Sequence, residues 1–288
     1  MRDWVRVAAW NIAGFSTSFY LGYGVLLWSF QESLIFPAPG GIDRRSLDLG
    51  AAEVGAAPFD LVASDGTQLY GWHYRHREER LVLYFPGNAE TVAGNIALHR
   101  LLLQNDWDVA VLAYRGYPGS HGRPSEQGLA LDAEALWQWS LVQGYEPHQI
   151  VLHGRSLGGG VAARLAERHN PAALVLESSF RSLRAVAHRY APLHPVDWLL
   201  RHPFDTDKRA HLLGVPTFIA NSRADRTVPP DLSAYSVRDR FADAETWLVD
   251  GWSHSHCLPL VSQEVGFAYV RFLDQAVPKS PFQGMTED

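Results

Sequence analysis

A serine between two glycines is the residue of this sequence best suited to chemistry. Residues 154–158 read Gly-Arg-Ser-Leu-Gly, which fits the pattern G-x-S-x-G around Ser156. The apolar residues 150–152 before it are typical of a buried strand, and residues 161–165 after it are typical of a helix. A strand, a glycine-flanked serine and a helix in this order present the hydroxyl at a sharp turn, where it can act as a nucleophile. The alternative is a glycine-rich turn with an incidental serine, because so short a pattern is common by chance.

An aspartate and a histidine follow the serine in positions that suit a proton relay. A serine hydroxyl is a weak nucleophile until a base removes its proton, and a third group must orient that base. Asp225 follows the predicted strand at residues 215–220, and His254 follows the predicted strand at residues 247–249. Because sites in parallel sheets gather at the carboxyl ends of the strands, we expect both side chains near Ser156. Ser156 would attack, His254 would act as base and then as acid, and Asp225 would orient the imidazole.

Other residues compete for two of these roles. Asp231 and Glu177 are the alternatives to Asp225 as the acid. His256 competes with His254, because it lies two residues away in the same predicted loop. We prefer His254 because it falls where the loop after the last strand normally carries the base.

Backbone N–H groups are expected to bind the negative oxygen of a tetrahedral intermediate. The residue after the nucleophile, Leu157, supplies one such group. The loop after the predicted strand at residues 81–85 supplies the other, with the Asn88 N–H as the candidate donor and Gly87 allowing a close approach of the backbone. The alternative for this loop is an ordinary turn at the end of a strand. No metal-ligand spacing stands out, and the predicted chemistry needs no cofactor.

The elements that must position these residues alternate between strand and helix from residue 81 onward. Before them, two alternating runs flank an Asp-Gly pair and predict a hairpin. This order predicts an α/β fold with a mostly parallel central sheet and helices on both faces. The predicted strands are residues 58–63, 68–74, 81–85, 108–114, 150–152, 172–176, 215–220 and 247–249. Besides the helix after Ser156, the predicted helices are residues 92–104, 126–142 and 261–273.

Residues 181–211 interrupt this alternation. They are rich in tyrosine, tryptophan, phenylalanine and proline, and no strand is predicted at their centre. An insertion after a strand of an α/β enzyme commonly covers the site. We therefore expect a short cap here; the alternative is a helical excursion that completes the core.

The N-terminal stretch differs from ordinary globular sequence. Residues 7–30 form a run of 24 residues without Asp, Glu, Lys or Arg. As a helix this run would extend about 36 Å, enough to cross a hydrocarbon layer of about 30 Å. We expect a single-pass membrane helix, of the bacterial inner-membrane type, within residues 1–36, followed by a catalytic domain at residues 37–288. The alternative is a buried or surface-lying amphipathic helix.

Composition sets the remaining limits. With 288 residues, of which 47% are hydrophobic and 19% charged, the chain suits one large domain with a sizeable core. A net charge of −6 gives no reason to expect nucleic acid as a partner. The one cysteine, Cys257, cannot form a disulfide within the chain. The oligomeric state is left open.

Several segments together resemble a known family, the membrane-anchored abhydrolase-domain serine hydrolases. The segments, in chain order, are FPGNAETVAGN, AYRGYPGSHGRPSEQGLALDAEAL, HGRSLGGGVAARLA, LVLESSF, VPTFIANSRADRTVPP and DGWSH. The resemblance covers residues 32–272 and implies an α/β-hydrolase fold, a Ser156, Asp225 and His254 triad, and an N-terminal membrane segment. Two positions depart from the family pattern. Pro86 stands where the family usually has histidine, and Asn221-Ser222 replaces the usual His-Gly before the acid.

This family includes lysophospholipid lipases, monoacylglycerol lipases and protein depalmitoylases, and it is similar more distantly to serine aminopeptidases. We therefore expect a membrane-bound serine hydrolase that cleaves acyl esters or thioesters of lipid-like substrates. One alternative is a peptidase of the aminopeptidase type, in which Asp197, Asp205 or Asp207 of the predicted cap would hold a substrate amino group. Another alternative is a binding protein without catalytic activity.

Overall fold

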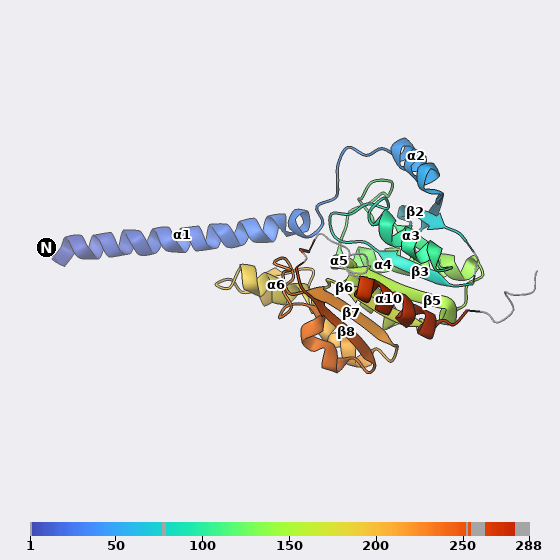
Figure 1. Cartoon of the computed structure of the whole chain (residues 1–288). Coiled ribbons are helices and arrows are strands. Elements are labelled where there is room, and N and C mark those ends of the chain that lie inside the picture. The colour runs from blue at the N-terminus through green and yellow to red at the C-terminus, as the bar shows by residue number, and fades with distance from the viewer. Residues whose placement is uncertain (1, 77–78, 252, 255–262, 280–288) are drawn as a thin grey trace, which may run out of the picture.

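An eight-stranded sheet runs through the centre of the molecule (Figure 1). The computed structural model describes the chain apart from residues 1, 77–78, 252, 255–262 and 280–288. The strand order across the sheet is β1-β2-β4-β3-β5-β6-β7-β8. The strands are β1 (Ala57–Val62), β2 (Gln68–Tyr74), β3 (Leu81–Phe85), β4 (Asp108–Leu112), β5 (Ile150–Arg155), β6 (Ala173–Glu177), β7 (Thr217–Ser222) and β8 (Ala244–Val249).

Most neighbouring strands are parallel. β2 pairs antiparallel with both β1 and β4, and every other pairing in the sheet is parallel. Every residue of β3, β4, β5 and β6 is buried, because helices cover both faces of these strands, and most of their residues are accordingly apolar. This explains why these strands appear in the sequence as short continuous apolar runs.

Helices cover both faces of the sheet. Along β2, neighbouring side chains point to opposite faces. The Tyr74 ring lies 5.0 Å from His99 of α3 (Ile96–Gln104), and the His73 ring lies 5.1 Å from Trp139 of α4 (Glu126–Val142). The predicted fold class, a mostly parallel sheet flanked by helices, is therefore confirmed. The helices are α1 (Arg2–Ile35), α2 (Arg44–Val54), α3 (Ile96–Gln104), α4 (Glu126–Val142), α5 (Leu157–Ala166), α6 (Leu183–Tyr190), α7 (Val196–Leu199), α8 (Thr206–Arg209) and α10 (Gln263–Ala276), with 3-10 turns at Pro147–Gln149, Ala210–Leu212 and Ala234–Arg240.

One helix was not expected from the sequence. The predictions place no helix between the N-terminal run and the hairpin, yet α2 forms there. Its N-cap is Asp43, whose side chain accepts a hydrogen bond from the Ser46 N–H at 2.7 Å, and it ends at Gly55 with a positive φ of 75°. These are ordinary start and stop signals of a helix, and they lie in a short segment whose composition resembles a linker.

The segment expected to form a cap contains three short helices, α6, α7 and α8. The Ser182 side chain caps α6 by accepting a hydrogen bond from the Ala185 N–H. No strand forms within residues 181–211, all of which are described. The cap at these residues, and the division of the chain at residue 37, stay predictions at this point.

The prediction of a single-pass membrane protein is wrong. The helix itself is present, since α1 spans 34 residues and projects from the domain in Figure 1. Within the part of the chain that the structure describes, however, no helix has the combination of length and apolarity that a membrane crossing requires. The run of uncharged residues is long enough, but Asn11, the Ser-Thr-Ser run at residues 16–18 and several glycines make it too polar.

Candidate active site

Ser156 sits in a strained turn between β5 and α5. Its backbone has φ 50° and ψ −114°, a conformation that residues other than glycine rarely adopt. A Cβ atom at Gly154 would collide with the backbone of Gly158, and one at Gly158 would collide with the carbonyl of Phe85. Only glycine fits these two positions, so the turn can be this tight. The strain at Ser156 is maintained by the surrounding structure, as is common at functional sites.

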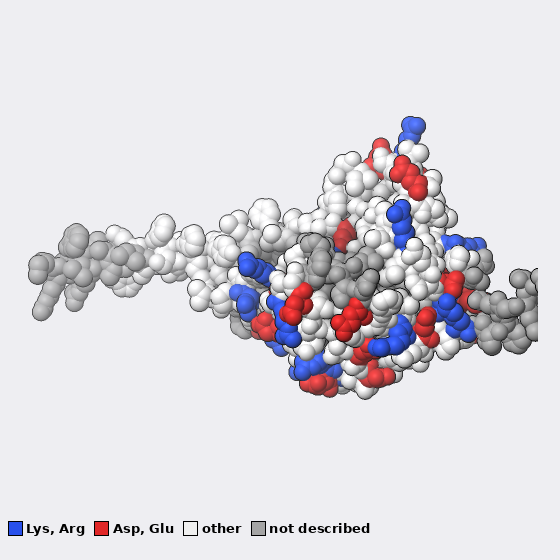
Figure 2. Space-filling view, in the orientation of Figure 1, with Lys and Arg blue, Asp and Glu red and all other residues white. Residues whose placement is uncertain are grey.

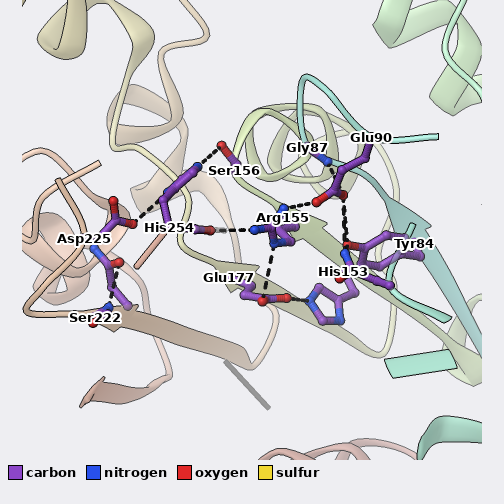
Figure 3. Close-up of polar contacts among 12 residues, drawn as sticks. Tyr84, Gly87, Glu90, His153, Arg155, Ser156, Glu177, Ser222, Asp225 and His254 are labelled. Atoms are coloured by element: carbon purple, nitrogen blue, oxygen red, sulfur yellow. Dashed lines mark hydrogen bonds and ion pairs between the residues drawn. The ribbon is translucent and has the colours of Figure 1, made fainter. Parts of the chain in front are cut away.

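Ser156, His254 and Asp225 form one chain of polar contacts (Figure 3). The Ser156 Oγ lies 2.9 Å from His254 Nε2, and His254 Nδ1 lies 2.7 Å from Asp225 Oδ2. The Asp225 side chain is completely buried, whereas the His254 side chain is 16% exposed. The structure thus brings together three residues from loops that are far apart in the sequence. In this arrangement the imidazole can take a proton from the serine while the carboxylate holds the ring.

The Asp225 carboxylate is fixed from its other side. Its Oδ1 accepts hydrogen bonds from the N–H groups of Thr227 at 2.9 Å and Val228 at 2.8 Å. Asn221 and Ser222, the two residues that depart from the family pattern, also hold this loop. The Asn221 side chain donates to the Val228 carbonyl at 3.1 Å, and the Ser222 Oγ accepts from the Ala224 N–H at 3.2 Å.

The alternative acids lie elsewhere. Glu177 is buried and pairs with His153 Nε2 at 3.0 Å. Asp231 is an exposed residue that forms an ion pair with Arg189 at 3.0 Å. His256, the alternative to His254, lies outside the described residues.

The loop after β3 is held by three side chains. Glu90 accepts a hydrogen bond from the Gly87 N–H at 2.8 Å. The Tyr114 hydroxyl donates to the Pro86 carbonyl at 2.9 Å, and the Tyr117 hydroxyl donates to the carbonyl of Asn88 at 2.5 Å. Burial raises the pKa of both tyrosines above the usual value, so both remain neutral donors.

The two predicted oxyanion donors border the same cavity as Ser156, to which Asn88 and Leu157 both contribute. Leu157 is the first residue of α5, so its N–H has no acceptor within that helix. Their role as donors stays a prediction. Tyr114 and Tyr117 belong to one of the segments that resemble the family, and both hold the loop that carries Asn88.

Arg155 is a residue of the site that the sequence reasoning missed. It occupies a variable position of the G-x-S-x-G pattern, and only 6% of its side chain is exposed. Its guanidinium contacts the Glu90 carboxylate, donates to the carbonyl of His254 at 2.5 Å, and lies 3.6 Å from Glu177 Oε1 (Figure 3). A charged residue before the serine is the only sequence signal, and it does not indicate these partners.

Comparison with known proteins identifies the family of the chain. A family model described as the alpha/beta hydrolase fold matches residues 80–199. A protein of Mycobacterium tuberculosis named only as uncharacterised is 35% identical over 245 residues, which cover 81% of this chain and 84% of that protein. The alpha/beta hydrolase domain-containing protein WAV2 of Arabidopsis thaliana is 31% identical over 229 residues, covering 71% of this chain and 74% of that protein. The chain belongs to the ABHD-type α/β-hydrolases.

Two further similarities extend the comparison. The lysophosphatidylserine lipase ABHD12 of Danio rerio is 32% identical over 171 residues, which cover 52% of this chain and 44% of that protein, so the match spans less than half of ABHD12. The solved structure of the Pyrococcus furiosus esterase Pf2001 superposes with a TM-score of 0.66 at 17% identity and covers 83% of this chain and 98% of that one. This structural likeness shows a shared α/β-hydrolase fold.

In this α/β-hydrolase a cavity of about 550 Å³ lies beside Ser156 and His254. Most of its lining is aliphatic or aromatic, and among the described residues the only Lys, Arg, Asp or Glu that lines it is Arg226. Such a cavity suits an apolar ligand with few polar groups. Among the described residues no cluster of His, Cys, Asp or Glu has a geometry that could hold a metal ion.

Proposed function

We propose that this α/β-hydrolase is a serine hydrolase that cleaves carboxylic ester or thioester bonds of lipid-like substrates. The observation that carries the proposal is the contact chain from Ser156 Oγ through His254 to Asp225. Ser156 and His254 of this chain line an apolar cavity. The contacts are as short as proton transfer requires. The apolar lining favours a fatty acyl group over a charged or sugar-like one.

In the proposed reaction, the Ser156 oxygen attacks the carbonyl carbon while His254 Nε2 takes the hydroxyl proton. The buried Asp225 carboxylate stabilises the positive charge that the imidazole then carries. The N–H groups of Leu157 and Asn88 bind the developing oxyanion, a contribution of about 3 kcal/mol for each donor. The alcohol or thiol leaves with the proton from His254. Water then attacks the carbonyl carbon of the acyl-enzyme while His254 takes its proton, and Ser156 leaves with that proton as the acid is released.

The remaining parts of the chain take supporting roles in this proposal. We place the catalytic domain at residues 37–288. We place a cap at about residues 181–211, because Leu183, Val186 and Val196 of this segment line the cavity at Ser156.

A peptidase of the aminopeptidase type gains no support from the acidic residues of the cap segment. Asp197 and Asp205 both pair with Arg184, at 2.6 and 3.1 Å. Neither they nor Asp207 is among the described residues that line the cavity. An acid that holds a substrate amino group would have to face the cavity with its charge available.

The test uses the purified full-length chain, a fluorophosphonate probe and p-nitrophenyl butyrate. We expect the wild type to be labelled and to hydrolyse the ester, whereas Ser156→Ala loses labelling and activity falls by a factor on the order of 10⁴ or more. Ser64→Ala is the control, since Ser64 lies in the exposed turn between β1 and β2. A folded wild type that neither reacts with the probe nor hydrolyses the ester would support a binding protein instead and overturn the proposal.

A further inference from the structure

The N-terminal helix forms part of the cavity that contains Ser156. The last third of α1 contributes six lining residues, namely Tyr23, Leu27, Trp28, Gln31, Leu34 and Ile35. Their spacing of mostly three or four residues places them on one face of the helix. The helix extends about 18 Å between Tyr23 and Ile35, so this wall is more than three turns long.

The amide of Gln31 docks α1 onto the C-terminal end of α7 and the residues after it. Its Nε2 donates to the Leu199 carbonyl at 3.0 Å, and its Oε1 accepts from the Arg201 N–H at 2.8 Å. Both halves of the amide are therefore used, and Gln31 is only 6% exposed. Arg201 adds an ion pair with Glu32 at 3.1 Å and lies over the Trp28 ring at 5.0 Å.

A second contact lies three turns earlier on the same face of α1. The Tyr20 hydroxyl donates to the Leu193 carbonyl at 2.7 Å, and the Tyr20 ring stacks on His194 with the centroids 4.5 Å apart. Tyr23 meets the same imidazole edge-on at 5.3 Å. Two separate attachments on one face fix the orientation of the helix, so the face that lines the cavity is set by directional contacts.

A second helix, α6, also lines the cavity. Leu183, Val186, Ala187 and Tyr190 line the cavity and follow the spacing of one helical face. No residue of α6 is fully buried. The two helices therefore present apolar faces to the same space, next to the hydroxyl of Ser156. In Figure 1, α6 lies alongside the end of α1 that joins the domain.

We propose that α1 from Tyr23 to Ile35 is one wall of an acyl-chain site, and that this wall gives the enzyme its preference for long acyl groups. The inference rests on the proposed function, because the acyl group enters the site only when its carbonyl reaches Ser156. A fatty acyl chain extending from the carbonyl between α1 and α6 covers both apolar faces. Each methylene group that leaves water is worth about a fourfold gain in kcat/KM when it stays buried in the transition state.

The test compares neighbouring leucines of α1. Leu27 lines the cavity, whereas Leu26 is 55% exposed and is not among the lining residues. In the full-length chain, kcat/KM is measured for p-nitrophenyl butyrate, octanoate and laurate at concentrations where each ester is monomeric. We expect Leu27→Trp to lower the ratio of kcat/KM for laurate to kcat/KM for butyrate at least tenfold, because the indole fills the part of the cavity between α1 and α6. Leu26→Trp should keep this ratio within twofold of the wild type.

A second variant tests whether the contacts that hold α1 in place matter for the acyl-chain site. Gln31→Ala removes the amide that holds α1 to Leu199 and Arg201, and we expect the laurate-to-butyrate ratio to fall in this variant also. Melting temperature and fluorophosphonate labelling report that each variant is folded.

The outcomes separate this inference from the proposed function. Equal ratios in wild type, Leu27→Trp and Gln31→Ala overturn the acyl wall, and so does a wild type that hydrolyses butyrate but not laurate; the proposed function stands in both cases. A wild type that neither hydrolyses any ester nor reacts with the probe overturns both.

Discussion

Arg155 contacts both of the loops that a reacting ester would touch. Through Glu90 it reaches the loop after β3, which carries Asn88, and through the carbonyl of His254 it reaches the loop of the base. Its third neighbour is the buried carboxylate of Glu177, at 3.6 Å. A planar guanidinium can serve several acceptors at fixed angles, which an ammonium group cannot. Arg155 is therefore in a position to fix the distance between base and oxyanion site.

We predict that Arg155→Lys lowers kcat for p-nitrophenyl butyrate by roughly 10- to 100-fold with little change in KM. The reason is that a displacement of about 1 Å at the reacting groups costs on the order of 100-fold in rate. Steady-state kinetics and the rate of fluorophosphonate labelling check this positioning role. Arg271→Lys is the control, because Arg271 is exposed on α10 and pairs with Glu245 at 2.8 Å. A kcat equal to that of the wild type in folded Arg155→Lys would show that the arginine has only a structural role.

The loop after β3 depends on tyrosines from the segment after β4. The two segments meet because β3 and β4 are neighbours in the sheet, although α3 separates them in the sequence. The hydroxyl of Tyr117 is the direct restraint on Asn88, whose carbonyl it binds.

Tyr117→Phe removes this restraint while keeping the ring. We expect kcat to fall several-fold, because the Asn88 N–H is less well placed, and the unfolding free energy to drop by about 1 kcal/mol for the lost hydrogen bond. Tyr235→Phe is the matched control, since the Tyr235 hydroxyl makes no hydrogen bond among the described residues. Equal effects of the two substitutions on kcat would contradict the role of Tyr117.

The elements near the site differ in how well the sequence predicts them. The positions of Ser156, Asp225 and His254 follow from local signals, because each lies within a few residues of the end of a strand, and parallel strands bring their carboxyl ends to one edge. The contact between Arg155 and Glu90 follows only from the order β4-β3-β5-β6, which differs from the order along the chain. For α1, the sequence shows a long run without charged residues. Such a run does not reveal whether lipid or a protein segment contacts it, and here residues 191–201 contact its last part. In Figure 2, the part of the helix between its grey N-terminal residues and the domain is white, without blue or red side chains.

Across the whole molecule, several histidines lie inside the sheet-and-helix core. His99 of α3 is fully buried, and neither of its ring nitrogens has a hydrogen-bond partner among the described residues. It packs against the rings of Tyr74 in β2 and Tyr84 in β3, at 5.0 and 5.2 Å. Burial, with a smaller contribution from His153, lowers the pKa of His99 to about 3. The folded protein therefore keeps this imidazole neutral at pH values well above about 3.

This buried histidine makes the stability of the whole chain depend on pH. In the unfolded chain the imidazole has its ordinary pKa of about 6.5. Below that pH the imidazole is protonated in the unfolded state but stays neutral in the folded state. The contribution of the neutral His99 to the free energy of unfolding is fully present above about pH 6.5 and is lost as the pH falls toward about 3. Between pH 7 and pH 5, His99 alone should lower the free energy of unfolding by about 2 kcal/mol.

We predict that His99→Phe, which keeps a ring beside Tyr74 and Tyr84, shows a shallower fall of stability with acid than the wild type does. Urea unfolding at pH 5, 6 and 7 measures the slope, which is independent of any constant gain or loss from repacking the ring. His211→Gln is the control, because His211 is exposed, and its slope should match that of the wild type. If His99→Phe keeps the full acid dependence of the wild type, other groups carry it, and the neutral imidazole in the core is not what limits this fold at low pH.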